Sequence, residues 1–282
     1  MWTSENQLAA LDLAKYRALA TGSLVFTDTV EIRDGVRKVR RQFVTGDIGY
    51  LEGGLGAERF LRHVSRSGKI VFFEGDRTAE RKVREVYPDG RVDYFEGVSN
   101  AERVVRVIFA SGDIAYLEGD RGVERYVRQV LPSGTVIYFE GDRDAERKVR
   151  VVYPDGRVDY FEGVRGAERV LRVIWATGKT VYLEGERGTE RKVREVSFNG
   201  NIVFFEGIRG AERVVRKVFA NGGIAYFEGE RRAERVVRVI YADGRVAHFE
   251  GKRGEERLAR VVTPSEGNSQ GDNPPNPKRP RI

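Results

Sequence analysis

Apolar and polar residues recur along this chain with a period of 22 residues, and the period can be followed through ten copies from residue 46 to residue 265. One copy, residues 141–162, reads GDRDAERKVRVVYPDGRVDYFE. A unit this short cannot bury a core alone, so a fixed short period predicts a repeat domain in which each copy packs against its neighbours.

The segment around each turn predicts a β-hairpin. In residues 153–158, YPDGRV, Pro154 and Asp155 stand ahead of Gly156 between two runs of apolar residues. These residue types favour a tight turn between two strands. The alternation that follows, over residues 158–162, predicts a strand whose odd and even positions lie on opposite faces.

The returning segment is open to two interpretations. In residues 169–175, RVLRVIW, the regularly apolar positions are Leu171 and Ile174, and this spacing of three requires a bulge or a helical turn. A helical interpretation places Ala167, Leu171, Ile174 and Trp175 on one face and gives a strand-helix solenoid. The valine-rich composition favours strands. We predict an all-β fold, an elongated array of 22-residue β-hairpin repeats, with the solenoid and a closed ring of 44-residue propeller blades as alternatives.

Both ends of the chain differ from the array. Residues 1–22 predict an amphipathic helix, with Ser4 as N-cap and Leu8, Leu11 and Leu19 on one side, that caps the first repeat. Residues 23–45 are a degenerate first repeat without the Glu-Gly pair. Residues 266–282 are rich in Pro, Asn and Gly and predict a disordered tail. The predicted organisation is therefore cap, degenerate repeat, ten repeats (46–265) and tail.

Composition narrows the function classes. The 50 basic and 43 acidic residues leave a net charge of +7, a mild bias toward anionic partners. The absence of cysteine excludes disulfides, thiolate nucleophiles and zinc sites built on sulfur. With no signal-peptide pattern and no apolar run long enough to cross a bilayer, we expect a soluble intracellular protein without a cofactor. The basic cluster Lys278, Arg279 and Arg281 resembles the signals read by nuclear import receptors, which makes nuclear localisation an expectation.

Glutamate and arginine positions are unchanged in all ten copies. A catalytic site is one constellation in one pocket, whereas a feature present in every copy indicates a ladder that holds neighbouring strands in register. On paired strands, Glu162 can reach Arg169 or Arg172. The repeated carboxylates therefore predict a structural ion-pair ladder and a protein that is not an enzyme.

A further arginine column lies in the loop after Glu-Gly, where side chains are expected to be exposed. Equivalent residues in a stack of hairpins lie about 10 Å apart, so this row could follow an extended polyanion. Acidic neighbours beside five of the arginines weaken the field, and solvated loop charges are the alternative. The candidate binding residues are Arg77, Arg121, Arg143, Arg165, Arg187, Arg209, Arg231 and Arg253.

The aromatic-Glu-Gly phrase after an Asp-Gly turn, as in Tyr94-Phe95-Glu96-Gly97, resembles the MORN repeat. The resemblance implies stacked β-hairpins and a role in protein assembly or attachment to membrane lipid. The wording Glu-Gly-x-Arg-Gly-Ala-Glu-Arg-x-Val-Arg is also similar to repeats in uncharacterised proteins of algae and large DNA viruses.

These observations predict a non-enzymatic scaffold that presents a long regular surface. A protein partner or an assembly, including self-association, is the first expectation. The alternative is electrostatic binding of nucleic acid or anionic lipid, such as phosphoinositide, through the loop arginines and the tail. The aromatic column either packs in a core or forms a recognition surface. An enzyme acting on a polysaccharide along this row would need one carboxylate pair unlike the others, and no copy has one.

Overall fold

The computed structural model describes residues 26–33 and 35–264, and every regular element in this range is a β-strand. The predicted N-terminal helix, the predicted tail and the basic cluster Lys278, Arg279 and Arg281 lie outside the described residues. The chain divides into two compact units, with the boundary between Leu171 and Arg172. Strand β14, Arg169–Ile174, contains this boundary.

Strands of five or six residues alternate along most of the chain. The first unit contains β1 Phe26–Arg33, β2 Val36–Phe43, β3 Ile48–Glu52, β4 Arg59–Val64, β5 Ile70–Glu74, β6 Arg81–Val86, β7 Val92–Glu96, β8 Arg103–Ile108, β9 Ile114–Glu118, β10 Arg125–Val130, β11 Val136–Glu140, β12 Arg147–Val152 and β13 Val158–Glu162. The second unit contains β15 Thr180–Glu184, β16 Arg191–Val196, β17 Ile202–Glu206, β18 Arg213–Val218, β19 Ile224–Glu228, β20 Arg235–Ile240, β21 Val246–Glu250 and β22 Arg257–Val262.

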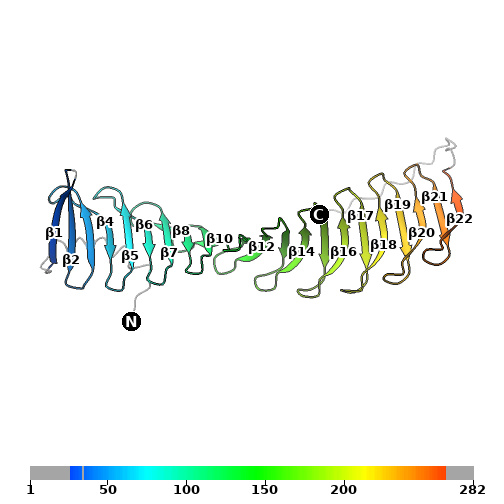
Figure 1. Ribbon diagram of the computed structural model, residues 1–282, viewed down its shortest axis with the longest axis horizontal. Helices are drawn as coiled ribbons and strands as arrows, with labels where there is room; N and C mark the ends of the chain where they lie inside the picture. Colours follow the sequence, from blue (N-terminus) through cyan, green and yellow to red (C-terminus); the bar gives the residue numbers. More distant parts are fainter. Residues whose placement is uncertain (1–25, 34, 265–282) are drawn as a thin grey trace, which may run out of the picture. The chain divides into compact units, whose positions relative to one another are not determined.

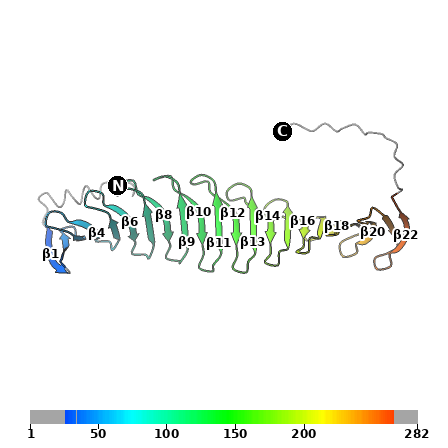
Figure 2. The ribbon, with the colours of Figure 1, turned by 90° about the horizontal axis from the view of Figure 1, so that it is seen from above.

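Within each unit every strand pairs antiparallel with the next strand in the chain (Figures 1 and 2). The predicted array of hairpins is confirmed. The strand-helix solenoid is wrong, because the described residues of both units contain no helix. Pairing continues from β2 to β13 without a break, so four-stranded propeller blades do not form.

Turn chemistry explains why the hairpins close where they do. Gly90 donates its N–H to the carbonyl of Tyr87 at 3.0 Å, and Tyr87 donates to the carbonyl of Arg91 at 2.8 Å. Gly90 has a φ of 93°, a left-handed conformation that glycine adopts without steric cost. This is a type I turn followed by a glycine bulge, a common three-residue connection between antiparallel strands.

The sequence spacing that allowed either a bulge or a helical turn is resolved as a β-bulge. Between β5 and β6 the register shifts so that Phe72 opposes Arg84 while Phe73 opposes Lys82, and Val83 has no partner. The β6 residues that precede Arg84 do not pair with β7, because the partners of β7 are residues 84–86 only. The first half of each returning strand therefore pairs on one side only.

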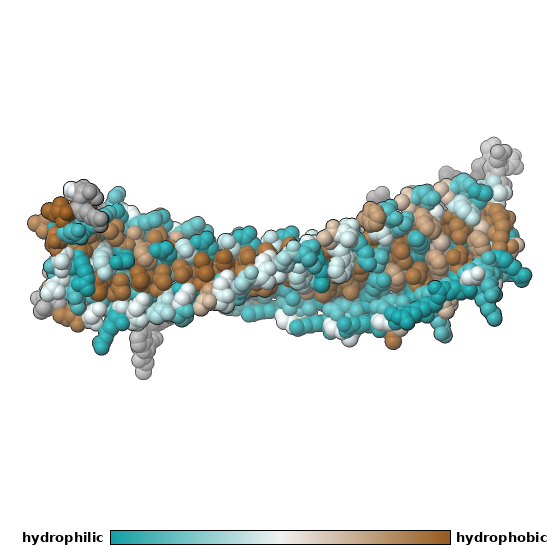
Figure 3. All heavy atoms as spheres, in the orientation of Figure 1, coloured by the Kyte–Doolittle hydropathy of each residue, from teal (hydrophilic) through white to brown (hydrophobic). Residues whose placement is uncertain are grey.

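Alternation places two sets of residues on opposite faces of the strands. The face named here the arginine face carries the column Tyr50, Phe72, Tyr94 and its equivalents, opposite Arg62, Arg84 and Arg106. The phenylalanine face carries Leu51, Phe73, Phe95 and their equivalents. A buried cluster on the latter, formed by Val39, Leu51, Phe60, Val71 and Phe73, is the core of the first hairpins. The described residues form no second layer of secondary structure, and Figure 3 shows hydrophobic side chains in a band across the strands of each unit.

A loop position suggests a stabilising substitution. Arg232 adopts a φ of 67°, where most other copies have glycine, such as Gly210 and Gly254. A left-handed conformation costs a side chain about 1 to 2 kcal/mol, partly offset by the greater freedom of glycine in the unfolded chain. We expect Arg232→Gly to raise the melting temperature, with a gain of about 0.5 to 1 kcal/mol. Arg231→Gly, at the preceding position, is the matched control and should not stabilise. A lower melting temperature for Arg232→Gly than for the unaltered protein would contradict the strain argument.

Candidate functional site

Glutamates of the Glu-Gly pairs form the predicted ion-pair ladder. Those from Glu52 to Glu228 each contact the first arginine of the next strand, as Glu74 does with Arg81 at 3.2 Å, and these two residues are direct cross-strand partners. Glu162 pairs with Arg169, one of the two arginines predicted for it. The Glu74 side chain is 63% exposed, and such surface pairs contribute between about 0 and 1 kcal/mol each. Equivalent pairs are Glu52–Arg59, Glu96–Arg103, Glu118–Arg125, Glu140–Arg147, Glu184–Arg191, Glu206–Arg213 and Glu228–Arg235.

The arginine three positions later has a different role, which the sequence did not reveal. Arg84 places its guanidinium over the ring of Phe72 at 3.9 Å, and Arg106 does the same over Tyr94. Distances in the other stacks lie between 3.7 and 4.1 Å. A cation above an aromatic ring is attracted by the ring's negative face and contributes about 0.5 to 1 kcal/mol at exposed sites. The remaining stacks are Arg62–Tyr50, Arg128–Tyr116, Arg150–Tyr138, Arg194–Tyr182, Arg216–Phe204 and Arg238–Tyr226.

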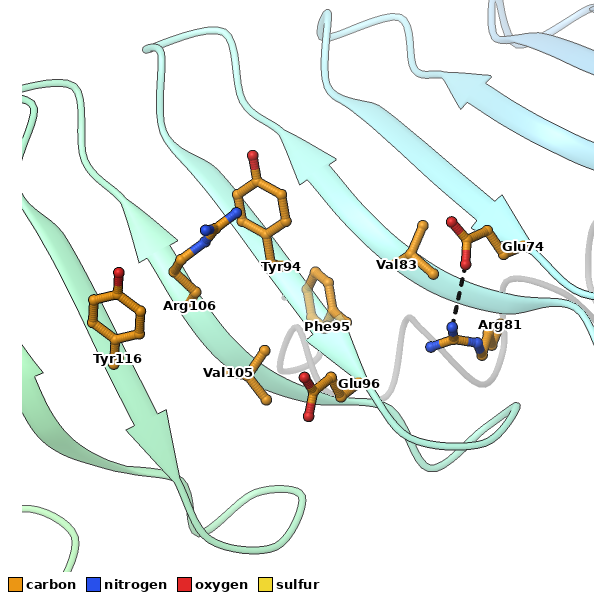
Figure 4. Close-up of a pocket in the computed structure, with 9 residues that line it drawn as sticks. All are labelled: Glu74, Arg81, Val83, Tyr94, Phe95, Glu96, Val105, Arg106 and Tyr116. Carbon is orange, nitrogen blue, oxygen red and sulfur yellow. Dashed lines mark hydrogen bonds and ion pairs between the residues drawn. The ribbon is translucent and has the colours of Figure 1, made fainter.

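The same open hollow recurs on the arginine face. In the first unit it has a volume of about 480 Å³ and is bordered by Tyr94, Arg106 and Tyr116 and by the Glu74–Arg81 pair (Figure 4). Figure 4 shows the Arg106 guanidinium directed toward the Tyr94 ring, with the aliphatic side chains lying between the aromatic and charged borders. A second hollow, one copy earlier, uses the equivalent columns, and a third lies in the second unit. Its lining residues are Glu184, Arg191, Val193, Phe204, Phe205, Glu206, Val215, Arg216 and Tyr226.

In most copies the glutamate of the Glu-Arg pair joins its copy to the copy before it. The Oε1 atom of Glu80 accepts the backbone N–H of Phe60 at 2.9 Å, and that of Glu102 accepts the N–H of Lys82 at 3.0 Å. These N–H groups lie in the half of the strand that the following strand does not reach. The carboxylate therefore replaces a missing strand partner. Glu80 is 2% exposed, so this hydrogen bond is shielded from water.

The same hydrogen bonds lower the pKa of two glutamates in later copies, Glu168 and Glu212. Partial burial raises the pKa of Glu168, but the N–H groups of Glu168, Lys148 and Gly166 outweigh it and hold the pKa below its usual range. The Glu212 pKa is lowered in the same way, by its own N–H and that of Lys192. Hydrogen bonds to a carboxylate favour its charged form. Glu168 and Glu212 are therefore ionised at neutral pH and act as hydrogen-bond acceptors.

The predicted loop arginines are on the surface, and several also connect neighbouring loops. All of them except Arg121 are exposed. Arg77 donates to the carbonyl of Gly56, and Arg143 donates to the carbonyl of Gly122. Arg121, Arg165 and Arg231 make the equivalent bond to Asn100, Asp144 and Gly210. These arginines thus stabilise the stacking of loops and also bring positive charge to the edge of each unit.

The phenylalanine face holds a group of buried ionisable residues in the first copies. Glu85 is 6% exposed and accepts hydrogen bonds from Tyr87 at 2.6 Å and from Lys82 at 3.0 Å. Asp93, 2% exposed, binds Arg91 at 2.8 Å. Burial raises the pKa of Tyr87, which keeps its hydroxyl protonated as a donor. The hydrogen-bonding groups of these buried side chains pair with one another, so the group forms a structural polar network.

His63 gives this region a pH-dependent stability. It is 3% exposed, and burial lowers its pKa, although Asp47 acts in the opposite direction. The unfolded chain therefore binds a proton before the folded chain does, and stability falls as the pH drops below about 6.5. His63→Val, which places the residue of Val107 and Val151 in the same column, should remove this pH dependence. Melting temperatures at pH 7.5 and pH 5 measure it. An unchanged slope in the variant would contradict the assignment.

Two comparisons with known proteins find nothing: no protein-family model matches the chain, and no curated protein sequence does. The solved structures that resemble it are of toxin complexes. A crystal structure of TcdB2-TccC3-TEV is 13% identical, with a TM-score of 0.18 over 88% of this chain and 13% of that chain. The Tc holotoxin pore of Photorhabdus luminescens is 10% identical, with a TM-score of 0.16 over 94% of this chain and 16% of that chain. This chain spans less than a fifth of either, and TM-scores this low do not indicate a shared fold.

Proposed function

We propose that the chain is a non-enzymatic scaffold that presents a repeated surface to another macromolecule, in the first place a protein. The observation that supports this most is the hollow of the arginine face, which recurs with the same columns in both units. A catalytic centre requires one constellation that differs from its surroundings, whereas a binding surface gains from repetition because each added contact multiplies affinity. No group of three metal-binding side chains lies within residues 26–33 and 35–264.

A random peptide library displayed on phage and selected on the immobilised protein tests this function. We expect enriched peptides that bind the folded protein and slow amide hydrogen exchange in the strands that they cover. If no peptide is enriched over a control without the protein, a peptide-binding function is wrong. An assembly of this chain with itself is checked in the same preparation by sedimentation over a range of concentrations.

The second candidate, electrostatic binding of nucleic acid or phosphoinositide, is supported by the exposed row of loop arginines. Binding of the full chain to DNA, RNA and phosphoinositide vesicles should be measured across a salt series, with and without residues 266–282. Affinity that falls steeply with salt and survives removal of these residues would place this candidate first. Binding that disappears with them would exclude the loop arginines as the site.

We also propose nuclear import through the cluster Lys278, Arg279 and Arg281. A fluorescent fusion of the full chain should enter the nucleus, and replacement of the three residues by alanine should abolish the accumulation. Equal distribution of both fusions would exclude the signal. Among the described residues, no helix is both apolar enough and long enough to cross a bilayer.

A further inference from the structure

In the copies that contain Arg84, Arg106 and Arg128, the arginine face carries one positive charge that no carboxylate in the described part of the chain neutralises. Its first arginine is neutralised by the ladder glutamate, as in Glu74–Arg81. Its second arginine, represented by Arg84, Arg106 and Arg128, stacks on an aromatic ring and forms no ion pair with the described residues. Because the ring holds the arginine stem, the guanidinium is oriented before any partner arrives, and its N–H groups can bind a carboxylate.

An aliphatic strip runs beside this row of charges. The bulge residues Val83 and Val105 contribute to the hollow of Figure 4. Ile70 and Val86 are direct cross-strand partners on the other side of the aromatic column. All of these residues are half-buried. A partner must therefore combine apolar side chains with acidic ones at its margin, and both must recur with the period of the array.

The period selects the conformation of the partner. Two paired strands per copy, each about 4.8 Å from the next, give a repeat of about 9.6 Å. Seven residues of an α-helix span about 10.5 Å, so one heptad matches one copy with a difference of about 1 Å. Over four copies the difference reaches about 4 Å, less than the length of a long side chain. An extended strand fails, because the three residues that span about 10 Å point to alternate faces.

A polyproline helix has a similar repeat of about 9.3 Å, but its usual recognition depends on open aromatic faces that pack against proline. Here one face of each such ring is occupied by a guanidinium, at 3.9 Å in the Arg106–Tyr94 stack. An amphipathic helix needs no free ring face. It places apolar residues on the valine strip and acidic residues over the guanidinium row.

From this geometry we propose that the arginine face binds an amphipathic α-helix with an acidic heptad repeat, laid across the strands with one heptad per copy. The proposal rests on the proposed scaffold function and specifies its partner. It assigns Arg84, Arg106 and Arg128 as carboxylate-binding residues and Val83 and Val105 as the apolar floor.

The test uses the full chain and a labelled synthetic peptide of four heptads, with leucine at the two core positions of each heptad and glutamate beside them. Three comparison peptides are a scrambled sequence of the same composition, a version with lysine in place of glutamate, and an acidic proline-rich peptide with a three-residue repeat. Fluorescence anisotropy gives the dissociation constants. We expect the acidic heptad peptide to bind at least about tenfold more tightly than each comparison peptide, a difference of about 1.4 kcal/mol.

Matched variants locate the binding surface. Arg84→Gln, Arg106→Gln and Arg128→Gln together should weaken binding at least about tenfold, because three charge-assisted bonds are lost. The loop variant Arg121→Gln, Arg143→Gln and Arg165→Gln removes the same net charge and should change affinity less than about threefold. If the first variant fails to fold, a second one with Val83→Thr, Val105→Thr and Val127→Thr replaces it and should also weaken binding.

Preference for the proline-rich or scrambled peptide, or equal weakening by the two arginine variants, would overturn the proposal. If the heptad peptide fails while the phage library yields other ligands of this protein, the scaffold function stands and only the helical partner is wrong. If both fail and sedimentation shows no self-association, the scaffold function itself is wrong.

Discussion

Replacing Glu80 with alanine is expected to lower the free energy of unfolding by about 2 to 3 kcal/mol, because a buried N–H group loses its charged acceptor. The carboxylate accepts the backbone N–H of Phe60 at 2.9 Å. Glu80 and Phe60 are 2% and 4% exposed, so water cannot reach the vacated donor without opening the strand. The loss should be largest at the junction of the two copies that this bond joins.

Urea unfolding measures the change, and amide hydrogen exchange locates it. Exchange at the Phe60 N–H should accelerate strongly in Glu80→Ala. Glu80→Gln should cost less, about 1 kcal/mol, since the amide oxygen remains an acceptor without the charge. Glu74→Ala is the matched control in the same copy, where a 63% exposed surface pair is lost and the change should stay below about 1 kcal/mol. Unaltered exchange at Phe60 would show that the carboxylate does not hold this strand.

Gly207→Ala is expected to destabilise by about 2 to 4 kcal/mol, from left-handed strain and from a forced backbone shift. Gly207 has a φ of 112°. A Cβ atom there would lie 2.7 Å from the carbonyl oxygen of Ala211, closer than any real contact of this kind. Because that oxygen belongs to the backbone of the same loop, it can move only if the loop changes shape.

Gly210→Ala separates the two causes. Gly210 lies in the same loop with a φ of 78°, but an added Cβ atom would meet nothing within 4 Å. This substitution should therefore cost only the conformational strain, about 1 to 2 kcal/mol, less the part that is offset by the smaller freedom of alanine in the unfolded chain. Melting temperatures of the two variants give the comparison. Equal losses would mean that the steric contact at Gly207 adds nothing.

The fold was predictable because its determinants are local. A Pro-Asp-Gly turn and strands of alternating residues predict hairpins, and the structure contains both. The spacing of Leu171 and Ile174 alone could not decide between bulge and helix. That choice depends on cross-strand pairing, such as Lys82 opposite Phe73, which the order of residues along the chain does not show.

The candidate surface was less predictable because it is made between copies. Two glutamate positions and two arginine positions are unchanged in every copy, and this constancy marked them as candidates. It did not show that Glu80 binds a backbone N–H or that Arg84 stacks on Phe72. Each role depends on where the bulge moves the register. The arginine stacks could have been predicted from the hairpin register, because that register places the second arginine of each copy opposite an aromatic residue, as with Arg84 and Phe72. The exposure of the loop arginines was predicted, but their hydrogen bonds to backbone carbonyls were not. These bonds depend on the left-handed loop residue of the preceding copy, as with Arg143 and Gly122.

Several contacts between neighbouring hairpins join residues 19 to 21 positions apart, as in Arg66–Asp47, Phe60–Glu80 and Arg77–Gly56. If one whole copy such as residues 75–96 were removed, the equivalent residues of the next copy would take the place of the deleted ones. Every contact between neighbouring copies would then keep a partner. Residues 75–98 and 141–164 differ at only two positions, so their coding segments can recombine with each other. The array can therefore gain or lose whole 22-residue repeats during evolution, and the fold itself does not set the number of repeats.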